Sequence, residues 1–140
     1  MQQGDQEFRE KNQLTDGIIG ACIAVHRALG PGLLESAYEH CLARELELRG
    51  LPFRRQVAVE IHYEGTLVDC GYRIDLLVCD EIVVELKSVE QLQPIHVAQV
   101  VTYLKLGRYP TGLLVNFNVT SLRHGLRRLT RRDLNSPRSP

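Results

Sequence analysis

The sequence predicts one domain of the mixed α/β class (α+β-like), in which two helices precede a mainly antiparallel meander and a helical crossover returns to the same sheet. Its 140 residues are enough for one hydrophobic core without disulfide or metal staples. Apolar residues recur at helical spacing near the N-terminus, whereas residues 53–89 contain short apolar or alternating runs between turn residues. The expected order of elements is α-α-β-β-β-α-β-α.

Two helices are expected before residue 50. Residues 1–13 are polar and unpatterned, so we expect a flexible N-terminus there. Thr15 or Asp16 can cap a first helix, which the Gly30-Pro31-Gly32 stretch should end. A second helix should run from near Leu33 to about Arg49, with Tyr38 and Leu42 on its inner face.

Three strand candidates follow in succession, at Phe53–Ile61, Leu67–Val78 and Ile82–Val89. Glu64-Gly65 should form a turn between the first two strands. The second candidate is long for one strand, and Gly71 is the expected position of a bulge or bend.

The C-terminal part begins with a third helix, from Pro94 to Gly107, followed by a strand over Thr111–Val119. A short final helix is expected because leucines recur three and four residues apart, at Leu122, Leu126 and Leu129. Residues 14–130 would then form the single domain, and residues 131–140 a disordered basic tail.

Composition indicates an ordinary globular protein and leaves nucleic-acid contact open. Residues 1–110 hold 11 Lys/Arg and 16 Asp/Glu, whereas residues 111–140 hold 6 Arg and 1 acidic residue. No run is long enough to span a membrane and no signal peptide is evident, so we expect a cytoplasmic protein without a membrane partner. The four cysteines are scattered, which favours free thiols over a zinc cluster.

The stretch Ile82–Ser88 suggests a functional site, because Glu85 and Lys87 project from the same face of an otherwise apolar strand. If residues 79–81 form a three-residue loop, Asp75 lies opposite Glu85 on that face. A two-residue loop would place the carboxylates on opposite faces. Opposed carboxylates repel, and a divalent cation between them would remove that penalty.

Each feature also has a structural interpretation. Glu85 and Lys87 can be an ordinary ion pair on a solvated face. Glu35 and Tyr38, three residues apart on a helix, can reflect the preference for acids in a first turn. Gln99 and Tyr103, four apart on the third helix, can mark its wet side.

Together these residues resemble the GxxExxY protein family, named for the pattern at Gly32, Glu35 and Tyr38. The resemblance spans roughly residues 12–129 and continues through three further motifs, which are Gly71–Val78, Val84–Lys87 and Gln99-x-x-x-Tyr103. That family is similar to the PD-(D/E)XK nuclease superfamily. The resemblance implies a restriction-endonuclease-like αβββαβ core, with a mixed central sheet flanked by helices and extra helices at both ends. Ile74 stands where the superfamily often has proline.

The resemblance further implies a Mg²⁺- or Mn²⁺-dependent nuclease. Asp75, Glu85 and the Leu86 carbonyl would ligate the ion, and Glu35 would be a further ligand or hold a water. Lys87 would orient the attacking water and neutralise charge in the transition state. The remaining assignments are Gln99 as part of the catalytic set, and Tyr38, Arg73 and Tyr103 as residues that position the substrate. The implied partner is nucleic acid, with DNA favoured over RNA and a homodimer as one option.

Two other functions remain open from the sequence. The same fold can bind nucleic acid or a protein without cutting, and the modest positive charge is the best argument for that interpretation. Alternatively, Glu35 and Asp75 could act as the carboxylate pair of a sugar hydrolase. No tryptophan is present to stack on a sugar, which disfavours the second alternative.

Overall fold

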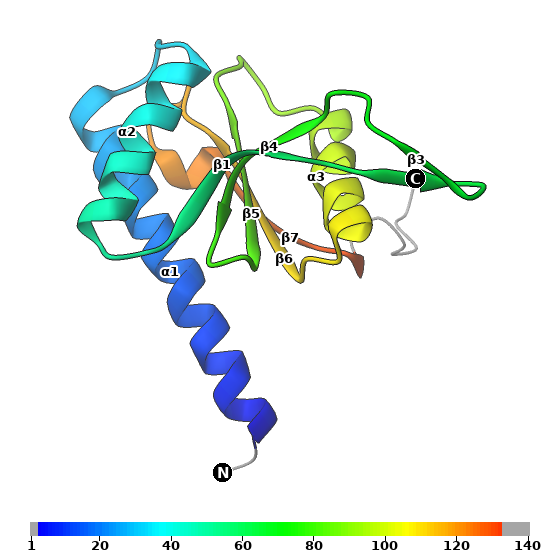
Figure 1. Ribbon diagram of the computed structural model, residues 1–140. Coiled ribbons are helices and arrows are strands. Elements are labelled where there is room, and N and C mark those ends of the chain that lie inside the picture. The colour runs from blue at the N-terminus through cyan, green and yellow to red at the C-terminus, as the bar shows by residue number, and fades with distance from the viewer. Residues whose placement is uncertain (1–2, 133–140) are drawn as a thin grey trace.

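The computed structural model describes residues 3–132 (Figure 1). Its described elements, in chain order, are α1 (Gln3–Leu29), α2 (Glu35–Leu48), β1 (Phe53–Ala58), β2 (Ile61–Tyr63), β3 (Thr66–Val68), β4 (Arg73–Val78), β5 (Ile82–Lys87), α3 (Pro94–Gly107), β6 (Thr111–Asn116), the 3₁₀ turn η1 (Leu122–Gly125) and β7 (Leu126–Thr130). Among the helices of these residues, none is long and apolar enough to cross a membrane.

In the described chain, β1, β4, β5, β6 and β7 form one sheet in that order. β1, β4 and β5 pair antiparallel, whereas β5 and β6 pair parallel because α3 carries the chain back across the sheet. This arrangement confirms the predicted meander followed by a helical crossover, and gives the predicted mixed sheet.

The sheet separates two hydrophobic cores. α1 and α2 cover one face, where Ile18, Leu42 and Leu46 pack on Leu76 and Val84. α3 covers the other face with Val100, Val101 and Leu104, against a separate set of strand residues (Figure 1). The central strands are therefore buried on both sides, which explains the continuous apolar runs in β5 and β6.

The β4–β5 hairpin has the three-residue loop that the functional interpretation of Asp75 and Glu85 requires. Val78 pairs with Ile82 and Leu76 with Val84, and the residues between are Cys79, Asp80 and Glu81. Cys79 and Asp80 have φ of 53° and 56°, which matches the right-handed twist of the strands that they join. The register on which the proposed carboxylate pair depended is therefore present.

The predicted strand over Leu67–Val78 is wrong in one respect, because it is two strands. β3 pairs with β2 in a separate hairpin, turning at Glu64-Gly65 as expected, whereas β4 joins the main sheet. Gly71 lies between them with φ of +82°, a left-handed conformation that glycine adopts without steric penalty. The expected bend is thus a complete break between two sheets.

The first helix begins at Gln3, not at the predicted cap on Thr15 or Asp16. The sequence did not predict this start because the residues there are polar. The N-terminal part of α1 extends beyond the body of the domain and has no apolar face from which a helical period could be recognised (Figure 1).

The predicted final helix over Leu122–Leu129 is also wrong. The segment is a 3₁₀ turn followed by β7, which pairs with β6. Leu126 packs against the α1/α2 core and Leu129 against the α3 core, so the three-residue spacing places them on opposite faces of a strand. Of the predicted basic tail, residues 133–140 lie outside the described residues.

Candidate active site

Asp75 and Glu85 meet where β4 and β5 stop pairing. The last ladder pair on this side is Leu76 with Val84. Beyond it, side chains take the place of backbone partners: the Asp75 amide donates to Glu85 Oε1 at 2.8 Å, and the Leu86 amide donates to Asp75 Oδ2 at 2.9 Å. The two strands separate here, and the two carboxylates lie in the gap that results.

The regular alternation of side chains between the two faces of the sheet is interrupted at the same position, beside Asp75. Ile74 packs in the α3 core, whereas Leu76, two residues further, packs in the α1/α2 core. Regular alternation would place both on one face. In the neighbouring strand, Gln56 lies opposite Asp75 in register and has φ of 51°. This irregular position lets polar side chains enter a sheet that is otherwise apolar on both faces.

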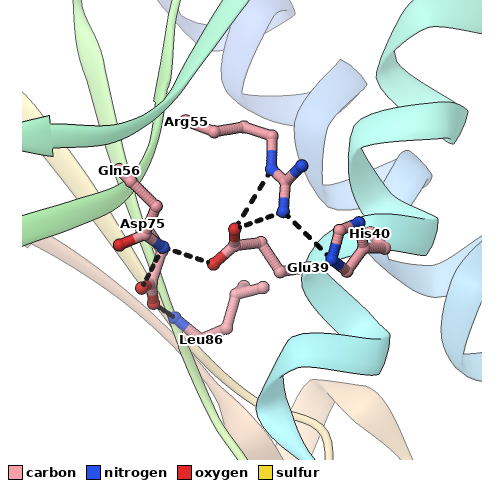
Figure 2. A network of polar contacts seen from close by, with 6 residues as sticks. All are labelled: Glu39, His40, Arg55, Gln56, Asp75 and Leu86. Carbon is pink, nitrogen blue, oxygen red and sulfur yellow. Dashed lines mark hydrogen bonds and ion pairs between the residues drawn. The ribbon is translucent and has the colours of Figure 1, made fainter.

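A further acid, Glu39, which the sequence analysis did not identify, belongs to this cluster (Figure 2). Glu39 Oε1 accepts a hydrogen bond of 2.7 Å from Gln56 Nε2, which also donates to Asp75 Oδ1 at 3.4 Å. Glu39 Oε2 pairs with the Arg55 guanidinium, at 2.8 Å from its Nη2 and 3.1 Å from its Nε. A polar chain thus runs from α2 through β1 to Asp75 and on to the Leu86 amide.

Glu39 could have been noticed in the sequence, because it follows Glu35 by four residues and shares its helix face. Gln56 gave no such signal, since its position depends on the pairing of β1 with β4.

Burial makes the two strand carboxylates difficult to ionise. Glu85 is 4% exposed, and its burial, followed by the charge of Asp75, raises its pKa to about 8. Burial likewise raises the pKa of Asp75; the Leu86 amide lowers it, and the charges of Glu39 and Glu35 raise it further. A positive charge beside this pair would favour the ionised forms.

Glu35 lies at the exposed start of α2, close to the end of β5. Its Oε1 is 3.4 Å from the Ser88 amide, and Ser88 Oγ donates to the Leu33 carbonyl at 2.5 Å. These contacts join the loop before α2 to the chain beyond Lys87. The charge of Glu35 reaches Asp75, as the pKa of that carboxyl indicates.

Lys87 is half-buried at the end of β5, two residues from Glu85, and its charge lowers the pKa of that carboxyl. Arg73 does not pair with Lys87 across the hairpin, because the β4–β5 ladder ends before that row. Its guanidinium instead contacts Asp69 Oδ1 at 3.4 Å.

The predicted residues of α3 differ in their surroundings. Gln99 is half-buried, whereas Tyr103 is 5% exposed with its ring 6.3 Å from that of Tyr72. Burial raises the pKa of Tyr103 to about 12, and the charges of Glu85 and Asp75 act in the same direction. Tyr103 therefore lies within electrostatic reach of both strand carboxylates.

Tyr38 lies in the core and not at the site. Its ring is fully buried and stacks on Phe117, with centroids 4.4 Å apart. Its hydroxyl donates to the Gly30 carbonyl at 2.6 Å and accepts from the Leu33 amide at 3.2 Å. This placement gives Tyr38 a structural role in holding the loop before α2, and it does not support the expected contact with substrate.

The chemistry of these side chains suits a hard divalent cation. Among the described residues, no three His, Cys, Asp or Glu side chains form a ready-made metal-binding group. Mg²⁺ commonly takes only one or two carboxylates from the protein and completes its shell with waters and substrate phosphate. Asp75, which is half-buried, and Glu85, which is buried, both have a raised pKa and are such a carboxylate pair.

Comparison with known proteins agrees with this arrangement. No match was found to a curated protein or to a solved structure. The family model described as "PD-(D/E)XK nuclease superfamily" matches residues 12–129, which include α2, the whole five-stranded sheet of the described chain except the end of β7, and α3. Members of that superfamily generally use divalent metals and act on nucleic acid. With its mixed sheet between helices and its acidic side chains at the point where two central strands part, the chain belongs to the PD-(D/E)XK nuclease superfamily and has its restriction-endonuclease-like fold.

Proposed function

We propose that the protein is a metal-dependent nuclease that hydrolyses a phosphodiester bond of DNA, with RNA as the alternative substrate. The observation that carries the proposal is the contact between Asp75 and Glu85, 2.8 Å from amide nitrogen to carboxylate oxygen, at the parting of β4 and β5. The motif at Gly32, Glu35 and Tyr38 supports membership of the GxxExxY family within the superfamily.

In this proposal the ion is Mg²⁺ or Mn²⁺, held by Asp75, Glu85 and the Leu86 carbonyl. The Leu86 amide already donates to Asp75, so the backbone at Leu86 is fixed close to the carboxylates. Glu35 supplies a further oxygen or holds a water. When bound, the ion would neutralise phosphate charge and lower the pKa of an attacking water.

Lys87 orients the water and offsets the charge that develops on the phosphate oxygens. The water oxygen forms a bond to phosphorus while the bond from phosphorus to one bridging oxygen breaks. The water loses a proton to solvent or a nearby base, and the leaving oxygen gains one, which yields a phosphate monoester and a free hydroxyl. Glu39 acts as a positioning residue, since it reaches Asp75 through Gln56.

Gln99 and Tyr103 would support the acidic cluster from α3 or contact the nucleic-acid backbone. Arg73 is exposed at the start of β4 and could contact a substrate phosphate in place of Asp69.

The test is cleavage of plasmid and single-stranded DNA with Mg²⁺, Mn²⁺ or chelator. Wild-type protein should cut only with metal, whereas Glu85→Gln and Lys87→Ala should lose at least 100-fold in rate. Glu90→Gln, an exposed carboxylate outside the site, is the matched control and should cut normally. Glu85→Gln keeps the oxygen that accepts from the Asp75 amide, so its folding should be preserved.

A titration with Mn²⁺ separates cutting from metal binding. We expect wild type to bind the ion and Asp75→Asn to bind it at least tenfold more weakly. Cleavage that persists in chelator would contradict the proposal. Nucleic-acid binding without cleavage under every metal condition would indicate a binding module on the same fold.

A further inference from the structure

A cavity lies on the α3 side of the sheet, whereas the polar chain of Figure 2 comes from the α2 side. Its volume is about 290 Å³, close to the lower end of the range for small-molecule sites. β1, β4, α3 and the hairpin of β2 and β3 contribute its walls. In Figure 1 the chain leaves β1, passes α3 and turns at that hairpin. Glu60 and His62, which line the cavity on the hairpin side, are exposed.

The aromatic wall of the cavity is fixed before any ligand binds. Arg108 adopts a left-handed conformation with φ of 59°, and the Tyr109 amide then bonds to the Leu104 carbonyl at 3.0 Å. This turn folds the Tyr109 ring over the last residue of α3. A Cβ on Gly107 would lie 2.2 Å from a carbon of that ring, so only glycine permits the position. Tyr109 is thus held against the end of α3, and its ring lines the cavity.

The cavity adjoins the candidate active site. Ile74, which lines it, is the residue immediately before Asp75. Tyr103 also lines it, and the charges of Glu85 and Asp75 act on the Tyr103 hydroxyl. A group bound in the cavity would therefore contact Tyr103, on which the charges of both carboxylates act.

The lining combines flat apolar surfaces with polar groups at the rim. Tyr109 provides the accessible aromatic surface, and Val57, Leu106 and the largely buried Tyr103 complete the apolar lining. Glu60 and His62 are exposed at the rim, and neither side chain makes a hydrogen bond or ion pair with a described residue. A nucleobase has the matching chemistry: a planar face that stacks on aromatic rings and an edge that donates and accepts hydrogen bonds.

We propose that this cavity is a subsite for one unpaired nucleobase of the substrate strand, next to the phosphate that is cut. This inference rests on the proposed nuclease function and specifies which kind of nucleic acid the nuclease would cut. A base inside a duplex is stacked on both faces and cannot enter a pocket unless it is extruded. Single-stranded nucleic acid, or a strand with unpaired bases, is therefore the preferred substrate.

The experiment uses a single-stranded DNA oligonucleotide that contains one 2-aminopurine, titrated with the full-length protein in chelator so that no cleavage occurs. Stacking on an aromatic ring quenches the fluorescence of this base. We expect quenching with wild type, and about tenfold weaker binding with Tyr109→Leu. Tyr63→Leu is the matched control, because Tyr63 is 69% exposed on the same side of the molecule and does not line the cavity.

Tyr109 packs against α3, so Tyr109→Leu can weaken binding by destabilising the fold. A second variant therefore tests the subsite without that effect. His62→Ala removes an exposed rim residue and should weaken binding with no change in thermal stability. The same oligonucleotide annealed to its complement should show weaker quenching than the single strand. Absence of quenching with wild type, or equal behaviour of Tyr109→Leu, His62→Ala and Tyr63→Leu, would overturn the subsite.

The subsite and the proposed nuclease activity can fail separately. Quenching without metal-dependent cleavage would retain the subsite and reject the activity. Cleavage without quenching would reject the subsite and leave the activity standing.

Discussion

At the scale of single residues, the site depends on side chains that replace backbone partners. Asp75 and Glu85 each accept a hydrogen bond from an amide that would otherwise bond across the ladder. Those bonds fix the half-buried Asp75 and the buried Glu85 close together, where their negative charges repel. The protein without metal therefore keeps an unfavourable arrangement, which a cation would relieve.

This arrangement predicts how the metal-free protein responds to pH. The pKa of Glu85 is about 8 in the folded state and close to 4.5 when unfolded, so between these values only the folded protein keeps the proton. The stabilisation is fully present below pH 4.5 and is lost as the pH rises through 8. We expect the free energy of unfolding in chelator to fall by a few kcal/mol, in order of magnitude, between pH 5 and pH 8.

Urea unfolding at several pH values measures this effect. Glu85→Gln, which cannot ionise, should show a much smaller fall over the same range. Equal slopes for the variant and wild type would contradict the assignment of the effect to Glu85.

Tyr38 offers a second test at this scale. Tyr38→Phe removes the hydroxyl that bonds to Gly30 and Leu33 but leaves the ring stacked on Phe117. We expect a loss of about 1 kcal/mol in unfolding free energy and an unchanged affinity for Mn²⁺. Loss of cleavage at full stability would instead support the contact with substrate that the sequence motif implied.

At the scale of elements, the distance between α3 and the sheet is set by one small residue. Gly112, the second residue of β6, faces the helix, and a Cβ there would lie 2.8 Å from Val100 Cγ1 and 3.3 Å from a methyl of Leu104. The helix therefore packs directly on the strand backbone. Because α3 also carries Gln99 and Tyr103, this packing sets how far those side chains reach toward the carboxylates.

Substitutions of two glycines should have opposite effects. Gly112→Ala should lower the unfolding free energy by about 1–3 kcal/mol through overpacking. Gly17→Ala should raise it by about 1 kcal/mol, since its Cβ would meet Leu51 at an ordinary 3.6 Å and alanine favours the helix. Chemical denaturation of both variants checks the pair, and a neutral Gly112→Ala would show that α3 is not held this closely.

At the scale of the whole molecule, the two hydrophobic cores lie on opposite faces of one sheet. The irregular position at Gln56 and Asp75 lies in the sheet between them. The polar chain from Glu39 enters this position from the α2 side, and the proposed base subsite opens on the α3 side. A substrate strand that crosses this end of the sheet would contact both.

The two cores also predict the reactivity of the four thiols. Cys22 is fully buried, and burial raises its pKa to about 12, whereas Cys41 and Cys70 are exposed. Cys79 is intermediate, and burial raises its pKa as well. At pH 8 we expect Cys41 and Cys70 to react with iodoacetamide first, and Cys22 slower by a factor on the order of 1,000 from its thiolate fraction alone.

Peptide mapping after timed alkylation measures this order, with the protein in urea as the control in which all four thiols react. Rapid labelling of Cys22 in the native protein would show that α1 does not stay packed on the sheet.

The features of this protein that could be predicted from its sequence differ physically from those that could not. The opposition of Asp75 and Glu85 follows from local spacing once the loop has three residues, because a short turn fixes the register of the strands beside it. The sequence left a two-residue loop open, and the structure has three residues there. The crossover through α3 was predicted from the order of the elements. Superfamily membership could likewise be inferred from four motifs in order. Periodicity failed at Leu126 and Leu129, since leucines three apart suit one face of a helix or both faces of a strand covered on two sides.

The sequence by itself therefore determined the class of fold, the two registers open to the central hairpin and the acidic residues upon it. Only the tertiary structure decided that Glu39 reaches Asp75 through Gln56, that the Tyr38 hydroxyl bonds to Gly30 and Leu33, and that a cavity is lined by Tyr103. The physical reason is the distance along the chain over which each feature is decided. A short loop limits the register of its two strands through a few residues of backbone, whereas these contacts depend on how helices far away in the chain pack across the sheet.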